Sequence, residues 1–319
     1  MSFVHLRLHS EYSVVDGTLR IDDGKGVKPL IGADVWMEPL AQASALFGAA
    51  AADKQPSRLL LLVQHERGYH HLCELLARAW TRNTQRTLAQ LKWEWLAELG
   101  DGLIVLSGAD LGAVGAALLG GDRERARLVA ARLAALFERR FYIELQRGGQ
   151  PQHEAHVRAA VPLAAELGLP VVATHPVQFL AAADFEAHEA RVCIAEGETL
   201  ANPRRVRRFT PEQYFKSTAA MRELFADLRP APANTVQIAK RCSLSLTLAP
   251  ARLPDFPTPG DEPIDAYFRR ASFEGLERRL LALFADPTQR DAERALYVER
   301  LEFELATIAT MGFAGYFLI

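Results

Sequence analysis

Residues 141–174 read FYIELQRGGQPQHEAHVRAAVPLAAELGLPVVAT and contain the pattern that decides the fold class. This stretch predicts a strand over Phe141–Gln146, a helix over Gln152–Leu167 and a second strand over Pro170–Thr174. Gly168 suits the left-handed position that follows the last turn of a helix, and the proline two residues later cannot continue that helix. Strand, helix and strand in this order are typical of an α/β unit around a mostly parallel sheet or barrel.

The same alternation extends toward the N-terminus. Short apolar runs predict further strands at Val4–His9, Pro29–Trp36, Arg58–Gln64 and Leu103–Ser107, with helical patterns between most of them. The clearest helical pattern covers Asp122–Arg139, where apolar residues recur on one face. The sequence therefore predicts an α/β fold.

A different pattern begins near residue 249. Residues 249–260 are rich in proline and predict a linker, because proline cannot be accommodated inside a helix. Two helical patterns follow, over Ile264–Phe284 and Asp291–Thr310. We therefore expect two domains, with residues 1–254 in the first and 255–319 in the second.

The composition excludes several classes of protein. The 319 residues include 37 Lys and Arg against 39 Asp and Glu, so the net charge of −2 provides no global field for a polyanion. Three widely spaced cysteines without a CxxC motif indicate a reducing compartment and exclude a cysteine-rich zinc site. No stretch is long and apolar enough to span a bilayer. We expect a cytoplasmic protein with no membrane partner.

Two places do not fit a complete chain. Residues 18–28 leave no room for a crossover helix before the next strand, although parallel strands require one, so a βα unit is expected to be missing at Asp23-Gly24. The last residues, 315–319, are an uncapped apolar run. We expect the chain to be a fragment of a longer protein.

The N-terminal stretch places three polar side chains on one face of an extended segment. His5, Arg7 and His9 share this face, and Asp16 follows a few residues later. One interpretation is a metal or phosphate site; the other is a pair of hydrogen-bonding histidines around a buried arginine. Arg7 argues against a metal, because a guanidinium cannot be a ligand and repels a divalent ion.

Several motifs together carry a resemblance. The sequence of residues 3–17 resembles the opening of the PHP (polymerase and histidinol phosphatase) domain of the alpha subunit of bacterial replicative DNA polymerase III. Further similar motifs follow in the order of that family, at residues 27–34, 68–72, 102–108, 141–146, 169–174, 184–189, 233–242 and 311–319. The resemblance implies a distorted (β/α)7 barrel that lacks one βα unit here, followed by helices at the start of a polymerase palm.

Carried over residue by residue, the resemblance also implies that the family's metal site is degenerate. The first position of its His-x-His pair is Arg7 here, while His9 and Asp16 are retained. Further remnant positions of the site are Asp34, Glu144, Pro176, Gln178 and His188. We expect no bound metal and no cofactor in this fragment, with Arg7 in place of the metal between acidic side chains such as Asp16, Asp34 or Glu144.

One local cluster of basic residues remains, formed by Arg204, Arg205, Arg207 and Arg208. It is interpreted either as a solvated loop that pairs with neighbouring acidic helices or as a contact for phosphate or for another subunit.

The resemblance implies that the full-length protein is a DNA-directed DNA polymerase, a nucleotidyltransferase of chromosomal replication. It would use Mg²⁺ held by palm carboxylates beyond Ile319, so that the fragment has no catalytic residue. The implied partners are the proofreading exonuclease (epsilon) subunit, the rest of the alpha chain, DNA and the sliding clamp. The role expected for the fragment is a non-catalytic scaffold that docks the exonuclease; the alternative is a residual metal-dependent phosphoesterase or 3′–5′ exonuclease.

Overall fold

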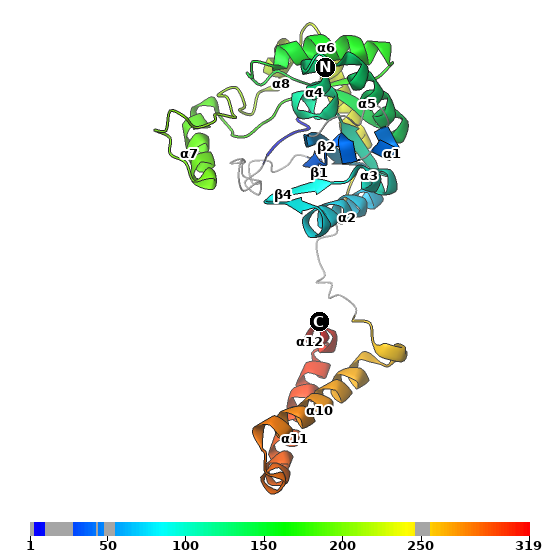
Figure 1. Ribbon diagram of the computed structural model, residues 1–319, viewed down its shortest axis with the longest axis vertical. Coiled ribbons are helices and arrows are strands. Elements are labelled where there is room, and N and C mark those ends of the chain that lie inside the picture. The colour runs from blue at the N-terminus through cyan, green and yellow to red at the C-terminus, as the bar shows by residue number, and fades with distance from the viewer. Residues whose placement is uncertain (1–2, 10–27, 43, 48–54, 246–255) are drawn as a thin grey trace. The chain divides into compact units, whose positions relative to one another are not determined.

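The computed structural model describes residues 3–9, 28–42, 44–47, 55–245 and 256–319 (Figure 1). The chain divides into two compact units, Met1–Ser245 and Leu246–Ile319. The expected deletion at Asp23-Gly24 and the candidate residue Asp16 lie outside the described residues.

The first unit is built on a seven-stranded sheet in the order β3-β4-β1-β2-β5-β6-β7. Its strands are β1 (Gly32–Met37), β2 (Ser57–Val63), β3 (Thr84–Gln85), β4 (Leu88–Leu91), β5 (Leu103–Leu106), β6 (Phe141–Gln146) and β7 (Val171–Thr174). The α/β prediction is confirmed, and β6 has the predicted bounds. The short strands β3 and β4 were not predicted from the sequence.

The expectation of a mostly parallel sheet is wrong around β2. This strand pairs antiparallel with β1 and with β5, whereas β5, β6 and β7 are parallel to one another. In the described part of the connection from β1 to β2, the helices are only a 3-10 turn, Leu40–Gln42, and the four-residue α1, Ser44–Phe47. Neither is long enough for a parallel crossover, so β2 returns in the opposite direction.

The predicted strand at Val4–His9 is also wrong. The segment forms only an isolated bridge, between Leu8 and Val177. The backbone N–H of Val4 donates instead to the hydroxyl of Thr235, at 3.0 Å, and that of His9 donates to the carbonyl of Val177, at 3.0 Å. Because these scattered acceptors satisfy the donors, the segment does not need a continuous ladder.

Helices cover both faces of the sheet. Their bounds are α2 (Glu66–Arg82), α3 (Trp93–Leu99), α4 (Ala113–Leu119), α5 (Arg123–Leu136), α6 (His153–Glu166), α7 (Phe185–Glu196), α8 (Thr218–Leu224) and α9 (Pro230–Arg241). Alternate residues of β2 enter different core clusters: Leu59 and Leu61 pack in a cluster with residues of α2 to α6, whereas Leu60 and Leu62 pack in a cluster that includes Ile238 of α9. The two faces of a pleated strand thus explain its continuous apolar sequence.

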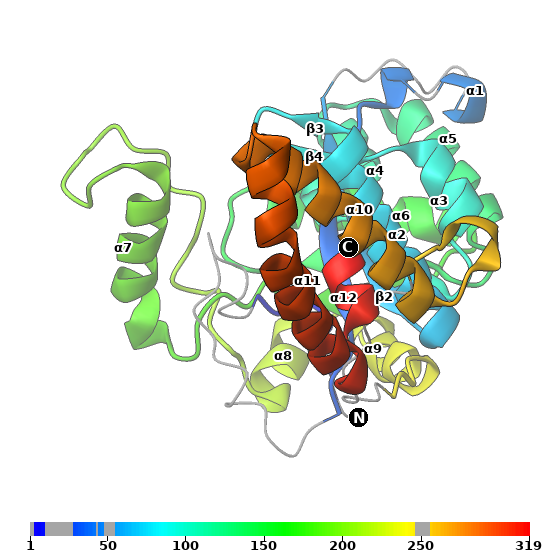
Figure 2. The same ribbon diagram turned by 90° about the horizontal axis from the view of Figure 1, so that it is seen from below.

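Two views of the ribbon show α7 to the side of the helices that cover the sheet (Figures 1 and 2). Its C-terminal residue is followed by Gly197, whose φ of 69° is the left-handed conformation that terminates the helix. The loop after α7 carries the basic cluster at residues 204–208.

The second unit contains, in its described part, a 3-10 turn, Pro259–Asp261, and three α-helices, α10 (Ile264–Leu283), α11 (Pro287–Thr310) and α12 (Ala314–Leu318). Phe268, Leu305 and Ala314 form their small shared core. The assignment of this unit to a polymerase palm stays a proposal. No helix in the described part of the chain combines the length and the apolar composition that a membrane span requires.

Candidate functional site

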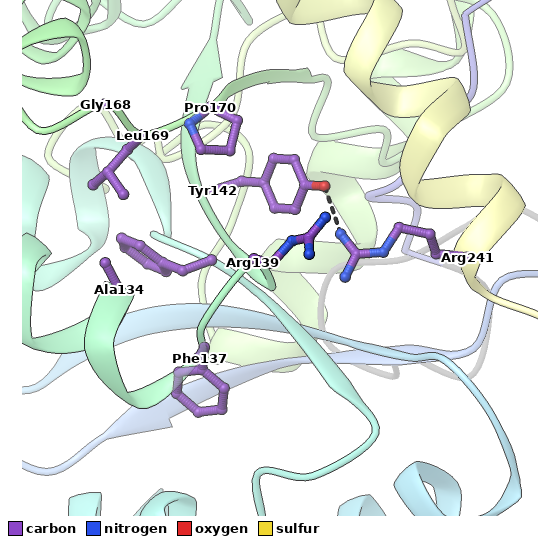
Figure 3. Close-up of a pocket in the computed structure, with 9 residues that line it drawn as sticks. Ala134, Phe137, Arg139, Tyr142, Gly168, Leu169, Pro170 and Arg241 are labelled. Carbon is purple, nitrogen blue, oxygen red and sulfur yellow. Dashed lines mark hydrogen bonds between the residues drawn. The ribbon is translucent and has the colours of Figure 1, made fainter.

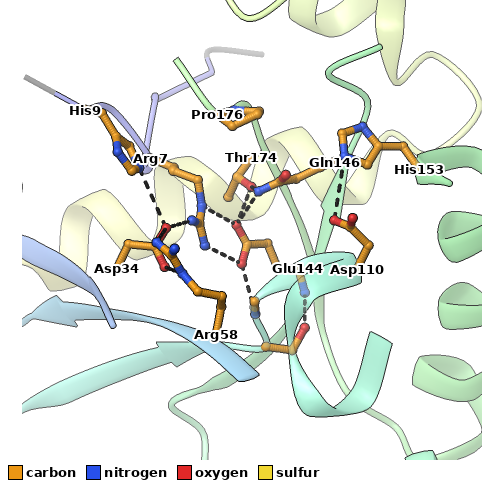
Figure 4. A network of polar contacts seen from close by, with 12 residues as sticks. Arg7, His9, Asp34, Arg58, Asp110, Glu144, Gln146, His153, Thr174 and Pro176 are labelled. Carbon is orange, nitrogen blue, oxygen red and sulfur yellow. Dashed lines mark hydrogen bonds and ion pairs between the residues drawn. The ribbon is translucent and has the colours of Figure 1, made fainter. Parts of the chain in front are cut away.

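A buried arginine joins two acidic side chains on different strands. Arg7 donates from Nε to Oε1 of Glu144, at 3.0 Å, and from Nη2 to Oε2 of the same residue, at 3.2 Å. Its Nη1 forms an ion pair with Asp34 of β1. The side chain of Arg7 is 8% exposed and that of Glu144 is fully buried, so both charges depend on each other for solvation. Figure 4 shows Arg7 between the two carboxylates.

A second arginine approaches Asp34 from the other side. Arg58 of β2 donates from Nε to Oδ1, at 3.0 Å, and its Nη2 lies 2.6 Å from Oδ2. His9 Nε2 lies 3.6 Å from Oδ2. Burial alone raises the pKa of Asp34, but the charge of Arg7, the hydrogen bond from His9 and the charge of Arg58 outweigh it and hold this pKa well below its usual range.

The pKa of Arg7 is raised, whereas that of Asp34 is lowered. Burial lowers the pKa of this guanidinium, but the nearby charges of Asp34 and Glu144 more than offset burial and raise it above its ordinary value. Arg7 is therefore a permanent cation.

The carboxylate of Glu144 is saturated with donors. Besides Arg7, its Oε1 accepts from the hydroxyl of Thr174 at 2.5 Å and from the amide of Gln146 at 3.1 Å, and its Oε2 accepts from the backbone N–H of Gly108 at 3.1 Å. Five hydrogen bonds thus end on two oxygens, which have about four lone-pair positions. A metal ion could reach this carboxylate only by displacing several of these donors.

These contacts test whether a metal centre fits. The carboxylates of Asp34 and Glu144 are held by guanidinium groups, and Arg7 occupies the space between them. Among the described residues, no group of three or more His, Cys, Asp or Glu side chains could hold a metal ion. The residues described here therefore do not fit the metal cluster that a hydrolytic site of this kind requires.

The structure brings together only some of the candidate residues. Arg7, His9, Asp34 and Glu144 form one network, and Pro176 lies beside it (Figure 4), with its carbonyl accepting from the amide of Gln213 at 3.3 Å. Gln178 is buried, and its backbone N–H donates to Gln213. His188 lies on α7, where its ring packs against Phe179 and Phe209 at centroid distances of 5.2 and 4.7 Å.

Sequence reasoning missed three members of the network, Arg58, Gln146 and Thr174. Arg58 carried a usable signal, because an arginine near the start of an otherwise apolar strand needs an acidic partner when it is buried. Gln146 and Thr174 end the adjacent parallel strands β6 and β7, where they pair in register. Their polar side chains at these strand ends could have indicated that they meet.

A second polar pair lies near the network. Nε2 of His153 is 3.6 Å from Oδ1 of Asp110, and Nδ1 of His153 accepts from the backbone N–H of Gly148 at 2.9 Å. Gln152 donates to the other oxygen of Asp110 at 2.9 Å. Burial lowers the pKa of His153, so this ring is neutral at pH 7 and links α6 to the loop after β6.

The basic cluster divides into paired and exposed residues. Arg205 is 2.5 Å from Glu189 in a buried ion pair, and Arg208 is 3.1 Å from Glu196, so both hold the loop to α7. Arg204 and Arg207 are exposed. The side chain of Arg208 is 63% exposed despite its ion pair, so Arg204, Arg207 and Arg208 are all exposed enough to contact another molecule, whereas the side chain of Arg205 is buried.

Comparison with known proteins identifies the relatives of the chain. Residues 23–148 match the PHP domain family. All of the chain aligns with DNA polymerase III subunit alpha of Pseudomonas aeruginosa at 42% identity and with that of Neisseria meningitidis serogroup B at 44%. The subunit of Escherichia coli K12 aligns with 99% of the chain at 40% identity.

The chain spans about 29% of the length of these relatives. The alignment with the Pseudomonas aeruginosa protein covers 352 positions, 33 more than the 319 residues of this chain. The seven-stranded α/β fold agrees with a PHP-type distorted (β/α)7 barrel. The chain is therefore similar over its whole length to part of bacterial DNA polymerase III alpha subunits, and its residues 23–148 match the PHP domain family.

Proposed function

We propose that this chain is the N-terminal part of a DNA-directed DNA polymerase and that its PHP domain is a non-catalytic scaffold that docks the proofreading exonuclease subunit. The observation that supports this proposal is the network in which Arg7 and Arg58 neutralise Asp34 and Arg7 neutralises Glu144. Carboxylates engaged in this way hold the fold together and are not available to bind metal or activate water.

The polymerase activity belongs to the full-length protein under this proposal. Polymerisation would require Mg²⁺ and palm carboxylates, while DNA and the sliding clamp would be partners of the rest of the alpha chain. The protein would act in the cytoplasm, where the chromosome is replicated.

The docking surface that we propose is the loop after α7. Arg204 and Arg207 are exposed there. Val206, next to Arg207 in the sequence, is 70% exposed, and Ile194 on α7 is 82% exposed. Exposed apolar groups rimmed by charge are a common feature of protein interfaces. This surface would suit a partner with an acidic rim.

Two measurements on the 319-residue chain test the proposal. Size-exclusion chromatography with the proofreading exonuclease subunit of the same organism should show co-elution. The double variant Arg204→Ala/Arg207→Ala should weaken it, whereas the control Arg67→Ala/Arg82→Ala on α2 should not. Co-elution that is absent, or equal in both double variants, would contradict the docking role of this loop.

Hydrolysis assays separate the scaffold from the alternative function. The cluster of His9, Asp34 and Glu144 is the feature that favours a residual phosphoesterase or 3′–5′ exonuclease. The chain should not hydrolyse p-nitrophenyl phosphate or a labelled DNA single strand with added Mn²⁺ or Zn²⁺. Hydrolysis that is abolished by Glu144→Gln would contradict the scaffold function and support the hydrolytic one.

A further inference from the structure

A pocket lies at the opposite end of the strands that carry the Arg7 network. Its lining residues are Ala134, Phe137, Arg139, Phe141, Tyr142, Gly168, Leu169, Pro170 and Arg241, and its volume is about 420 Å³. Phe141 and Tyr142 begin β6 and Pro170 precedes β7, whereas Gln146 and Thr174 end the same two strands. The pocket is thus separate from the site described above.

Two arginine side chains converge in this pocket. Arg139 follows α5 and Arg241 ends α9, and Figure 3 shows the two guanidinium groups directed toward one another beside the ring of Tyr142. Arg241 donates to the hydroxyl oxygen of Tyr142 at 2.8 Å. Within the described part of the chain, neither arginine forms an ion pair with a carboxylate. Two like charges held together in this way favour a shared counter-ion.

The polar side chains of the pocket offer donors to a ligand. Both guanidinium groups have only N–H donors, and the hydroxyl of Tyr142, which accepts from Arg241, still has its own proton to donate. No acidic side chain is among the described residues that line the pocket. A ligand that suits this set has several acceptor oxygens and a negative charge, as a phosphate group does.

The backbone at Arg139 supports a functional role for this side chain. Its φ is 57°, in the left-handed region that a side chain with a Cβ atom adopts only at a cost, and that glycine adopts freely. An arginine at such a position is unfavourable for folding alone, and residues held this way are concentrated at binding sites.

The remaining wall of the pocket is apolar. Leu169 and Pro170 lie on the side of Tyr142 away from Arg241 in Figure 3, and Gly168 before them leaves open space. The volume is within the range of pockets that bind small organic molecules. Charged donors on one side and an apolar wall on the other match a molecule that has both a phosphate and a ring.

We propose that this pocket binds a small organic phosphate. Arg139, Arg241 and the Tyr142 hydroxyl hold the phosphate group, and the organic part packs against Leu169 and Pro170. This inference is independent of the scaffold function, because it uses none of the residues of the Arg7 network or of the loop after α7.

Isothermal titration calorimetry on the 319-residue chain in low-chloride buffer tests the proposal with three probes. The probe 2′-deoxyadenosine 5′-monophosphate should bind, inorganic phosphate should bind more weakly, and deoxyadenosine without phosphate should not bind. Equal binding of deoxyadenosine and its monophosphate would overturn the role of the arginines, and no binding of either phosphate probe would overturn the site.

Two variants connect binding to the named side chains. Arg139→Gly and Arg241→Gln should each weaken binding of the nucleotide about tenfold or more, because each removes charged hydrogen bonds. The control Arg222→Gln changes an exposed arginine on α8 that does not line the pocket and should leave binding unchanged.

The Arg139→Gly variant also separates binding from folding. Glycine relieves the left-handed backbone at this position, so the melting temperature should be unchanged or higher while binding is lost. Unaltered nucleotide affinity in both Arg139→Gly and Arg241→Gln would overturn the proposal.

Discussion

Arg7 and Glu144 are joined at two points, from Nε to Oε1 at 3.0 Å and from Nη2 to Oε2 at 3.2 Å, although 137 residues separate them in the sequence. This parallel pairing of a guanidinium with a carboxylate is the strongest geometry available to the two groups. It fastens the N-terminal segment to the centre of β6. The same contact fills the place that a metal ion would need between Glu144 and Asp34.

Replacement of Arg7 by methionine should strongly destabilise the fold. The change removes the cation but leaves Asp34 and Glu144 buried, and an unpaired buried charge of this kind costs about 3–5 kcal/mol in the free energy of unfolding. Urea denaturation followed by circular dichroism measures the loss. Arg123→Ala, which breaks the exposed pair with Glu166, is the matched control and should have little effect. Equal stability of the Arg7→Met variant and the wild type would show that the network is not structural.

The Asp34 carboxylate should make stability depend on pH in the acid range. Its pKa is depressed in the folded state, so its contribution is complete above about pH 5 and is lost as the pH falls through the pKa of an unfolded aspartate, about 3.9, toward the lower folded pKa. The slope of the unfolding free energy should reach up to about 1.4 kcal/mol per pH unit for this proton. The variant Asp34→Asn should have a smaller slope between pH 5 and the acid unfolding transition. An identical slope in the two proteins would contradict the assignment.

His175 should make the stability of the fold depend on pH in a higher range than Asp34 does. Burial, together with the nearby positive charges of His5 and Lys216, lowers the pKa of His175 from 6.5 to about 4. The unfolded state therefore binds a proton that the folded state excludes, and stability should fall as the pH decreases from about 6.5 to about 4. His175→Gln keeps a donor for the carbonyl of Tyr214 and should reduce this slope, while exposed His70→Gln should not. Melting temperatures measured at half-unit pH intervals provide the comparison.

Gly108 should not tolerate a side chain. Its φ is 81°, its N–H donates to Glu144, and a Cβ atom would collide with the backbone carbonyl oxygen of Arg58. Gly121 has a similar φ of 78° but open space around it. Gly121→Ala therefore measures only the cost of placing alanine in the left-handed conformation. Gly108→Ala should destabilise the protein by about 1–3 kcal/mol more, because it adds the collision with Arg58. Equal losses in the two variants would show that the backbone at Arg58 can move aside.

Local sequence predicted the strands and helices that have a single strong pattern. Phe141–Gln146 has the predicted bounds, and the helix predicted over Gln152–Leu167 differs by one residue at each end. Val4–His9 has an equally good strand pattern, but its hydrogen-bond acceptors come from Thr235 and Val177. Those partners are far away in the sequence, so no local pattern could reveal them.

The candidate site shows the same limit. Arg7, Asp34 and Glu144 could be named from the sequence because they occupy positions of a family motif. Arg58 lies in none of the similar motifs, and Thr174 lies in one but was not identified as a site position; the role of both follows from the register of β1 with β2 and of β6 with β7. The direction of β2 also could not be predicted from its local sequence, because strands with parallel and with antiparallel neighbours can have the same apolar sequence.

We propose that Arg7 stands where a metal ion would otherwise bind. Inductively coupled plasma mass spectrometry of the purified chain, after incubation with Zn²⁺, Mn²⁺ and Fe²⁺ and removal of free metal, tests it most directly. We expect far less than one bound ion per chain for each of the three metals. One or more ions per chain, lost in Glu144→Gln, would contradict it.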